Sequence, residues 1–137
     1  MATYDKYQPF IQKMWNGDID LFGTTDTVMA FLHSDAPVLA TDDELADLVA
    51  VTGTGSGAID IQNDSTRAGG TITATAGIDP VWTAGAGDWV AGRYTATYDD
   101  TIAGDPLIND YDYGGNFTLL SGETFTLNFG ASWHTAA

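Results

Sequence analysis

The chain has 137 residues, enough for one domain that buries roughly two thirds of the surface its unfolded form exposes. It contains no cysteine, which excludes disulfide bonds, thiolate metal sites and thiol redox chemistry. Nineteen acidic residues against four lysines and arginines give a formal net charge of −15, which disfavours nucleic acid and anionic membranes as partners. Such a charge either keeps the protein soluble, or it makes the surface complementary to a basic protein partner or to cations.

The first residues lack a basic stretch followed by an apolar run, and no apolar run approaches the ~20 residues of a membrane span. We therefore expect synthesis and folding in a cytoplasm, with no membrane partner. We predict a single domain over 1–137, with an N-terminal helix or arm over about 3–16 and a β-rich body over about 26–130.

Residues 4 to 15 predict the one long helix, with Thr3 as its N-cap. An apolar stripe recurs at helical spacing and contains Tyr4, Tyr7, Phe10, Ile11, Met14 and Trp15. Pro9 suits only the first turn of a helix, so the helix could instead start near Gln8 after an extended arm. Asn16-Gly17 ends it. The stripe belongs either to the core or, through the arm, to a contact with a neighbouring subunit.

Thr27–His33 predicts a strand that is apolar on both faces. Val28, Ala30 and Leu32 share one face, and Met29 and Phe31 share the other. Such a strand is either central in the fold or has one face against a partner. We expect His33 to be a polar residue at the strand end, without a catalytic neighbour.

Thr41 and Glu44 fit a capping box at the start of a short helix, with Leu45, Leu48 and Val49 on its apolar face. Val51–Gly70 follows as a long polar loop that could contain a short strand. The glycines at 53, 55 and 57 do not form a phosphate-binding loop, because no Lys-Ser or Lys-Thr follows them.

The second half predicts antiparallel strands. Ile72, Ala74 and Ala76 alternate with threonines, as do apolar residues over 90–98. Phe125, Leu127 and Phe129 alternate with polar residues at the end of the chain. A three-residue loop over 120–122 would pair Phe117 with Phe125, with Gly122 left-handed at the end of the loop.

Together these patterns predict a mainly β fold, an antiparallel β-sandwich or barrel-like sheet with one N-terminal helix and one short helix. We find no catalytic constellation and predict no enzyme, no cofactor and no metal site. Aspartates cluster at 18 and 20 and again over 99–112, yet neither cluster has the spacing of a calcium loop, and solvated turns explain them. His134 has no nucleophile or orienting acid beside it. Trp82, Trp89, Tyr94 and Tyr98 could line a sugar site, although core packing is the simpler interpretation.

The order of several short motifs resembles a family of small structural proteins of tailed bacteriophages. The motifs span nearly the whole chain: Tyr4–Phe10, Asp26–Val28 with Ala36–Val38, Asp79–Trp82, Arg93–Tyr94 with Tyr98–Asp100, Asp105–Ile108, Asp112–Gly114 and Gly122–Phe125. The resemblance implies a virion component without catalytic residues. The chain departs from the family in its middle loop, rich in threonine and glycine, and in Asn109-Asp110, where more aromatic residues are expected.

We therefore expect a capsid decoration (cement) protein on the outside of a phage head, which binds the major capsid protein and forms a homo-oligomer. Six apolar residues are the candidate partner contacts: Tyr4, Tyr7, Phe10, Trp15, Met29 and Phe31. The alternative is a carbohydrate- or cell-surface-binding module on a tail or fibre.

Overall fold

The computed structural model describes residues 3–130 and 133–136, and these form a mainly β protein with antiparallel sheets, as predicted. In chain order the elements are β1 (Thr3–Lys6), α1 (Gln8–Asn16), β2 (Val28–His33), the 3-10 turn η1 (Leu45–Asp47), β3 (Ile59–Asp60), β4 (Asn63–Ala68), β5 (Thr71–Ala76), β6 (Val81–Thr83), β7 (Trp89–Asp99), β8 (Leu107–Leu119), β9 (Thr124–Thr126) and β10 (His134–Ala136). No helix in this described part is long and apolar enough to cross a membrane.

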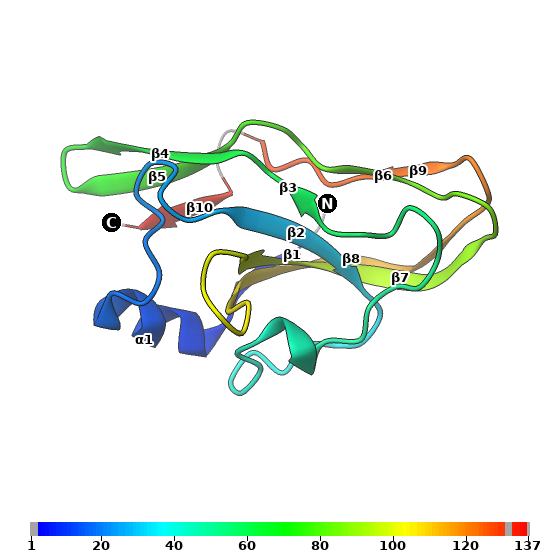
Figure 1. Ribbon diagram of the computed structural model, residues 1–137, viewed down its shortest axis with the longest axis horizontal. Helices are drawn as coiled ribbons and strands as arrows, with labels where there is room; N and C mark the ends of the chain where they lie inside the picture. Colours follow the sequence, from blue (N-terminus) through cyan, green and yellow to red (C-terminus); the bar gives the residue numbers. More distant parts are fainter. Residues whose placement is uncertain (1–2, 131–132, 137) are drawn as a thin grey trace.

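The strands form two layers, which Figure 1 shows one above the other. One layer is a five-stranded sheet with the strand order β1-β8-β7-β2-β3. The other contains the three-stranded sheet β10-β5-β4 and the β6-β9 pair. Because β1 and β3 end the larger sheet, it stays open, and the arrangement is a sandwich rather than a closed barrel. We call the face toward the smaller sheets the inner face, and the face toward α1 the outer face.

The core lies between the two layers. On β2, Val28, Ala30 and Leu32 point to the inner face and have no exposed surface. Opposite them, the alternation predicted at the end of the chain holds: Phe125, Leu127 and Phe129 are buried while the residues between them are exposed. The regular strand is shorter than the alternation, since β9 ends at Thr126.

The helix begins at Gln8, so the version with an extended arm is confirmed and the version spanning 4 to 15 is wrong. Tyr7 is the N-cap, Pro9 lies in the first turn, and Gly17 ends the helix in the left-handed conformation. Thr3, predicted as the N-cap, begins β1, an edge strand of the larger sheet that pairs with β8. The arm therefore completes the chain's own sheet.

The second helix is shorter than predicted and starts three residues later. Glu44 is the N-cap of η1, and the Asp47 carboxylate accepts the backbone N–H groups of Asp43 and Glu44. A capping box is present, but it comprises Glu44 and Asp47 rather than Thr41 and Glu44. Of the expected apolar face, Leu48 is buried and Val49 is exposed.

The long polar segment 51–70 contains more strand than expected. It contributes the short edge strand β3 and the whole of β4, which pairs with β5 in a hairpin. The sequence signal was weak because β4 is mostly exposed, so its side chains need no apolar alternation.

Strand β7 differs from its predicted half-buried alternation, because both of its faces are covered from Tyr94 to Asp99. Thr95 and Thr97 are buried on the inner face, and the Thr97 hydroxyl bonds to the Asn109 side chain on β8. Threonines that were expected to mark a solvent face thus lie in the core.

The predicted pairing of Phe117 with Phe125 within a β8–β9 hairpin is wrong, because β9 pairs with β6, with Trp82 opposite Phe125. Part of the prediction is confirmed. Gly122 is left-handed, and the Phe117 and Phe125 rings stack with centroids 4.5 Å apart. The two strands bring their side chains together across the layers, without sharing a hydrogen-bond ladder.

Candidate functional site

A buried polar network anchors the outer face of the five-stranded sheet. His33 ends β2, and its Nε2 lies 2.6 Å from the Asp110 carboxylate on β8. Tyr7 donates its hydroxyl to the same carboxylate at 2.9 Å. Asp35 lies 3.2 Å from the other ring nitrogen, Nδ1, and Tyr94 stacks on the ring. The network joins the N-terminal arm, β2 and β8 at one point.

Burial sets the electrostatics of this network. Loss of solvent raises the pKa of Asp110 from its ordinary value, while its bonds to His33 and Tyr7 oppose that rise. Burial and the nearby charge of Asp110 raise the pKa of the Tyr7 hydroxyl. Both nitrogens of His33 have carboxylate neighbours, and the ring has no exposed surface. The geometry therefore supports a structural anchor rather than a proton-transfer site open to a substrate.

The sequence did not reveal this anchor. His33 was expected to be an isolated polar residue, yet Asp110 lies 77 positions away in the chain and Asp35 only two. Asn109 and Asp110, the pair that departs from the phage family, are both buried and bonded. The local sequence gave little signal, because Asp110 lies in β8 among other polar residues such as Asn109 and Asp112.

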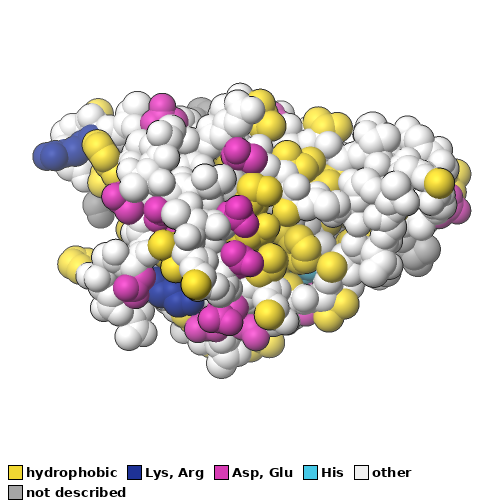
Figure 2. Space-filling model, in the orientation of Figure 1, with side chains coloured by type: hydrophobic (Ala, Val, Ile, Leu, Met, Phe, Trp, Pro, Cys, Tyr) yellow, Lys and Arg dark blue, Asp and Glu magenta, His cyan; other side chains and the backbone are white. Residues whose placement is uncertain are grey.

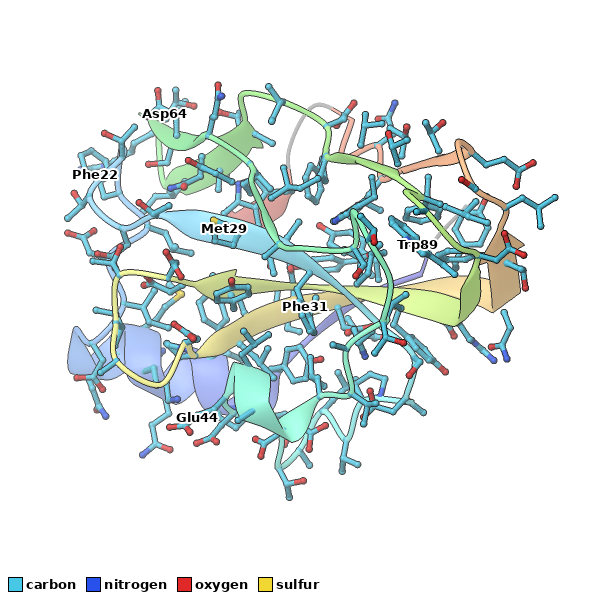
Figure 3. All side chains as sticks on the ribbon, turned by 45° about the vertical axis from the view of Figure 1, so that its right-hand side comes forward. Phe22, Met29, Phe31, Glu44, Asp64 and Trp89 are labelled. Carbon is cyan, nitrogen blue, oxygen red and sulfur yellow. The ribbon has the colours of Figure 1, made fainter. Side chains whose placement is uncertain are left out.

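Beside the anchor, an apolar patch covers the middle of β2. Met29 and Phe31, labelled in Figure 3, lie on the outer face opposite Tyr98 and Ala96 of β7, and both are partly exposed. Phe31 meets the edge of the Tyr98 ring, with centroids 6.4 Å apart. We call Met29, Phe31 and Tyr98 the β2 patch. The predicted strand with two apolar faces is thus central in the sheet and still exposes part of one face.

Acidic side chains border the β2 patch. Figure 2 shows a row of them along one side of the apolar surface. Burial raises the pKa of Tyr98 to about 12, and the charges of Asp100 and Asp105 act in the same direction. The patch is therefore an apolar centre with a negative rim.

A second apolar surface lies at the α1 end of the molecule. Trp15 is 85% exposed, and Ile11 and Met14 on the same helix are also exposed. A groove of about 160 Å³ runs beside them, lined by Met14, Ile19, Asp20, Leu21, Phe22, Ile72 and Ala74. We call the exposed side chains of Ile11, Met14, Trp15 and Phe22 the α1 patch.

The six candidate contact residues divide between surface and core. Trp15, Met29, Phe31 and the edge-strand residue Tyr4 offer surface to a partner. Tyr7 and Phe10 do not, since their side chains are 0% and 1% exposed and belong to the chain's own core. Tyr7 is the N-cap of α1 and Phe10 lies within the helix on its buried side, so both pack inward.

The aromatic rings proposed for a sugar site are also buried. Trp82 and Trp89 are 1% and 0% exposed, and their indole N–H groups donate to the carbonyls of Gly57 and Thr54. Gly55 has a positive φ, and a Cβ there would lie 2.1 Å from the Thr83 carbonyl oxygen. The glycine-rich segment is therefore a close-fitting cover for two tryptophans, which explains its composition without a ligand.

The aspartate clusters do not converge on a metal site. Within residues 3–130 and 133–136, no group of three or more His, Asp or Glu side chains is placed to hold a metal ion. Asp110 bonds to His33, and Asp112 forms a two-point ion pair with Arg93 at 2.8 Å. That pair lowers the pKa of Asp112 to about 2. The side chain of His134 lies outside the described part of the structure.

Comparison of the chain with protein-family models, with curated proteins and with solved structures gave no match. The resemblance to structural proteins of tailed phages therefore rests on the sequence motifs alone. What the structure adds is independent of it: a partly exposed apolar patch on β2 and an exposed one at α1, on a strongly acidic molecule.

Proposed function

We propose that this protein is a non-enzymatic virion component, a capsid decoration protein of a tailed bacteriophage that binds the outside of the head. The observation that carries the proposal is the β2 patch, apolar at its centre and acidic at its rim. Burial of such a surface contributes binding energy only where a partner covers it. The phage assignment itself comes from the motif resemblance.

Charge selects the kind of partner. With a formal net charge of −15, the protein is attracted at long range to a basic surface. The occupant of the β2 patch is therefore a surface of the major capsid protein with apolar residues at its centre and lysines or arginines around them. Rim charges of this kind act mainly on the association rate and its salt dependence.

The α1 patch supplies a second contact. A decoration protein that reinforces junctions between capsid subunits needs one surface for the shell and another for its neighbours. We assign the β2 patch to the shell and the α1 patch to a second copy of this chain, which gives a homo-oligomer with closed symmetry. Trp15 is the central residue of that contact, because it is the most exposed of the large apolar side chains that the structure describes.

Shell binding can be tested by sedimentation of the purified protein with undecorated shells made from the major capsid protein of the same genome. Wild-type protein should co-sediment at low salt, and decorated shells should survive heating better than bare ones. Asp100→Lys reverses one rim charge at an exposed position and should slow binding. Leu120→Ser, an exposed apolar residue on a distant loop, is the matched control and should bind as wild type.

Two outcomes would overturn the shell assignment: no co-sedimentation of wild-type protein, or equal heat resistance of bare and decorated shells. Self-association is tested separately by light scattering after size exclusion. The wild-type protein should show the mass of a small oligomer, and Trp15→Ser should reduce it to a monomer with unchanged thermal stability. A wild-type monomer at all accessible concentrations would contradict the homo-oligomer.

A further inference from the structure

A buried carboxyl group at the end of β7 lacks part of its expected solvation. Asp99 has no exposed surface. Its Oδ1 accepts the backbone N–H of Thr101 at 2.8 Å. Its Oδ2 has no hydrogen-bond partner among the described residues. A buried, ionised and unpaired carboxylate oxygen is costly, so some positive charge or proton has to compensate it.

The backbone holds a second carboxyl group beside it. Asp99 pairs with Val28, the Asp100 N–H donates to the Thr27 carbonyl at 2.9 Å, and the Thr27 N–H donates to the Thr101 hydroxyl at 2.8 Å. This register sets residue 26 opposite Thr101, so the Asp26 side chain lies on the same face as Asp99 and diagonal to it. Asp26 is itself only 5% exposed, so the two carboxyl groups meet in a nearly dry site.

Asp26 ties this site to the segment between α1 and β2. Its Oδ2 accepts the backbone N–H of Asp20 at 2.5 Å, and its carbonyl accepts the side chain of Asn63 at 2.9 Å. The conformation of residues 18–27, which carry the exposed Phe22, therefore depends on where the Asp26 carboxyl group lies.

We propose that Asp26 and Asp99 share one proton, and that the resulting carboxyl–carboxylate hydrogen bond is a pH-sensitive latch that holds residues 18–27 against the end of β7. The proton fills the vacant position on Asp99 Oδ2 and leaves one negative charge on the pair. This inference is independent of the proposed function.

The surroundings favour retention of the proton. Acidic groups surround the pair: Asp20, whose backbone N–H binds Asp26, Asp60 of β3 and Asp64 of β4 in the hollow that Asp26 lines, and Asp100, the next residue of the chain. Among the described residues, no lysine, arginine or histidine forms an ion pair with Asp26 or Asp99. Burial and the neighbouring Asp26 raise the pKa of Asp99 to about 6.

The direction of the pH effect follows from that value. A carboxyl group whose pKa is higher in the folded state than its ordinary 3.8 stabilises the fold below pH 3.8 and loses that contribution as the pH rises through about 6. Above pH 6 the pair carries two negative charges and the latch opens. The hollow beside Asp26, about 340 Å³ in volume and lined by Asp60, Asn63 and Asp64 among others, then gives residues 18–27 space to move.

The test compares wild type with Asp99→Asn across pH 4.5 to 8, by urea unfolding and by hydrogen exchange of residues 18–27. Between pH 4.5 and 8 the wild-type unfolding equilibrium should rise roughly thirtyfold relative to the variant, since the pKa of Asp99 is about 6 in the folded state and 3.8 in the unfolded chain. The side-chain amide that Asp99→Asn introduces can donate to Asp26 at any pH, so the variant should hold residues 18–27 protected throughout. Asp5→Asn, at an exposed position on the edge strand β1, should keep the wild-type profile.

Asp26→Asn provides a second variant in case Asp99→Asn does not fold, and it too should flatten the profile. Identical pH profiles for wild type and both variants would overturn the proposal. All measurements are repeated with excess EDTA and with excess Ca²⁺. A wild-type protein that becomes pH-insensitive only when Ca²⁺ is added would also overturn it, because a metal ion and not a proton would then fill the position between the carboxyl groups.

Discussion

Asp110 and Asp99 are both buried in the five-stranded sheet, on opposite faces, and their surroundings differ in kind. Asp110 on the outer face receives a hydroxyl from Tyr7 and lies 2.6 Å from a ring nitrogen of His33. Asp99 on the inner face receives one backbone N–H, and its other neighbour is a second carboxyl group. Burial of an aspartate therefore does not by itself define its role. Its partners decide whether it acts as an anchor or as a titrating group.

Of the substitutions that test this difference, replacement of His33 should cause the largest loss of folding stability. His33→Leu leaves Asp110 buried with Tyr7 as its remaining side-chain donor, and breaking a buried pair from one side costs about 3–5 kcal/mol. Urea unfolding at pH 7 measures the loss. Asp35→Asn, on the partly exposed side of the same ring, serves as the control and should cost about 1 kcal/mol or less. A small loss for His33→Leu would mean that Asp110 is not an anchor.

Removal of the Tyr7 hydroxyl, the second partner of Asp110, should reduce the free energy of unfolding by less. Tyr7→Phe removes one hydroxyl and keeps the ring in the core, so it should cost about 2 kcal/mol, the usual range for a hydrogen bond to a charged group. A double-mutant cycle with His33→Leu would show coupling, because both donors serve one carboxylate. Additive losses would contradict a shared network.

Near Asp99, removal of a neutral side-chain hydroxyl should reduce the free energy of unfolding by still less. Thr101→Ala removes the hydroxyl that accepts the Thr27 N–H and keeps the backbone bond to Asp99. We expect a loss of about 1 kcal/mol in the free energy of unfolding, with the pH profile unchanged. A change in the pH profile would show that the hydroxyl, rather than Asp26, controls the titration of Asp99.

The smallest effect should come from a carboxylate that is neither buried nor isolated. Arg93→Gln removes the ion pair with Asp112, both of whose side chains are about a third exposed, and should scarcely shift the urea midpoint at pH 7. Because Arg93 lowers the pKa of Asp112 to about 2, the ion pair contributes its stability to the wild-type protein above pH 3.8, the ordinary pKa of an aspartate. That contribution is lost as the pH falls through 2. A large loss of folding stability at pH 7 would mean that this ion pair anchors the fold, as the Asp110 network does.

The sequence predicts the local elements well where one face of a strand meets water. The alternation of Phe125, Leu127 and Phe129 with exposed residues is confirmed, as are the strand at 28–33 and the helix that begins at Gln8. In these segments the side-chain pattern and the backbone conformation report the same physical constraint, the burial of one face.

Pairing and polar burial could not be predicted in the same way. The stacking of Phe117 on Phe125 was expected, yet the ladder of β9 goes to β6, because side chains can meet across layers without backbone pairing. Thr95 and Thr97 resembled a solvent face and are buried. The partner of His33 is 77 residues distant, and no spacing rule connects residues that only the folded sheet brings together.

The pairing of the N-terminal strand with β8 also constrains the order in which the chain folds during synthesis. Tyr7 leaves the ribosome early, but its partner Asp110 lies 103 positions later. Until then β1 has no ladder to join, because its partner strand β8 is not yet complete, although the residues of β2 to β7 have already been synthesised. The closing of the arm onto β8 is therefore a late step of high loop-closure cost. A chain that stalls before residue 110 keeps an unpaired, aromatic-rich first segment, which makes unfinished chains the species most exposed to misassembly.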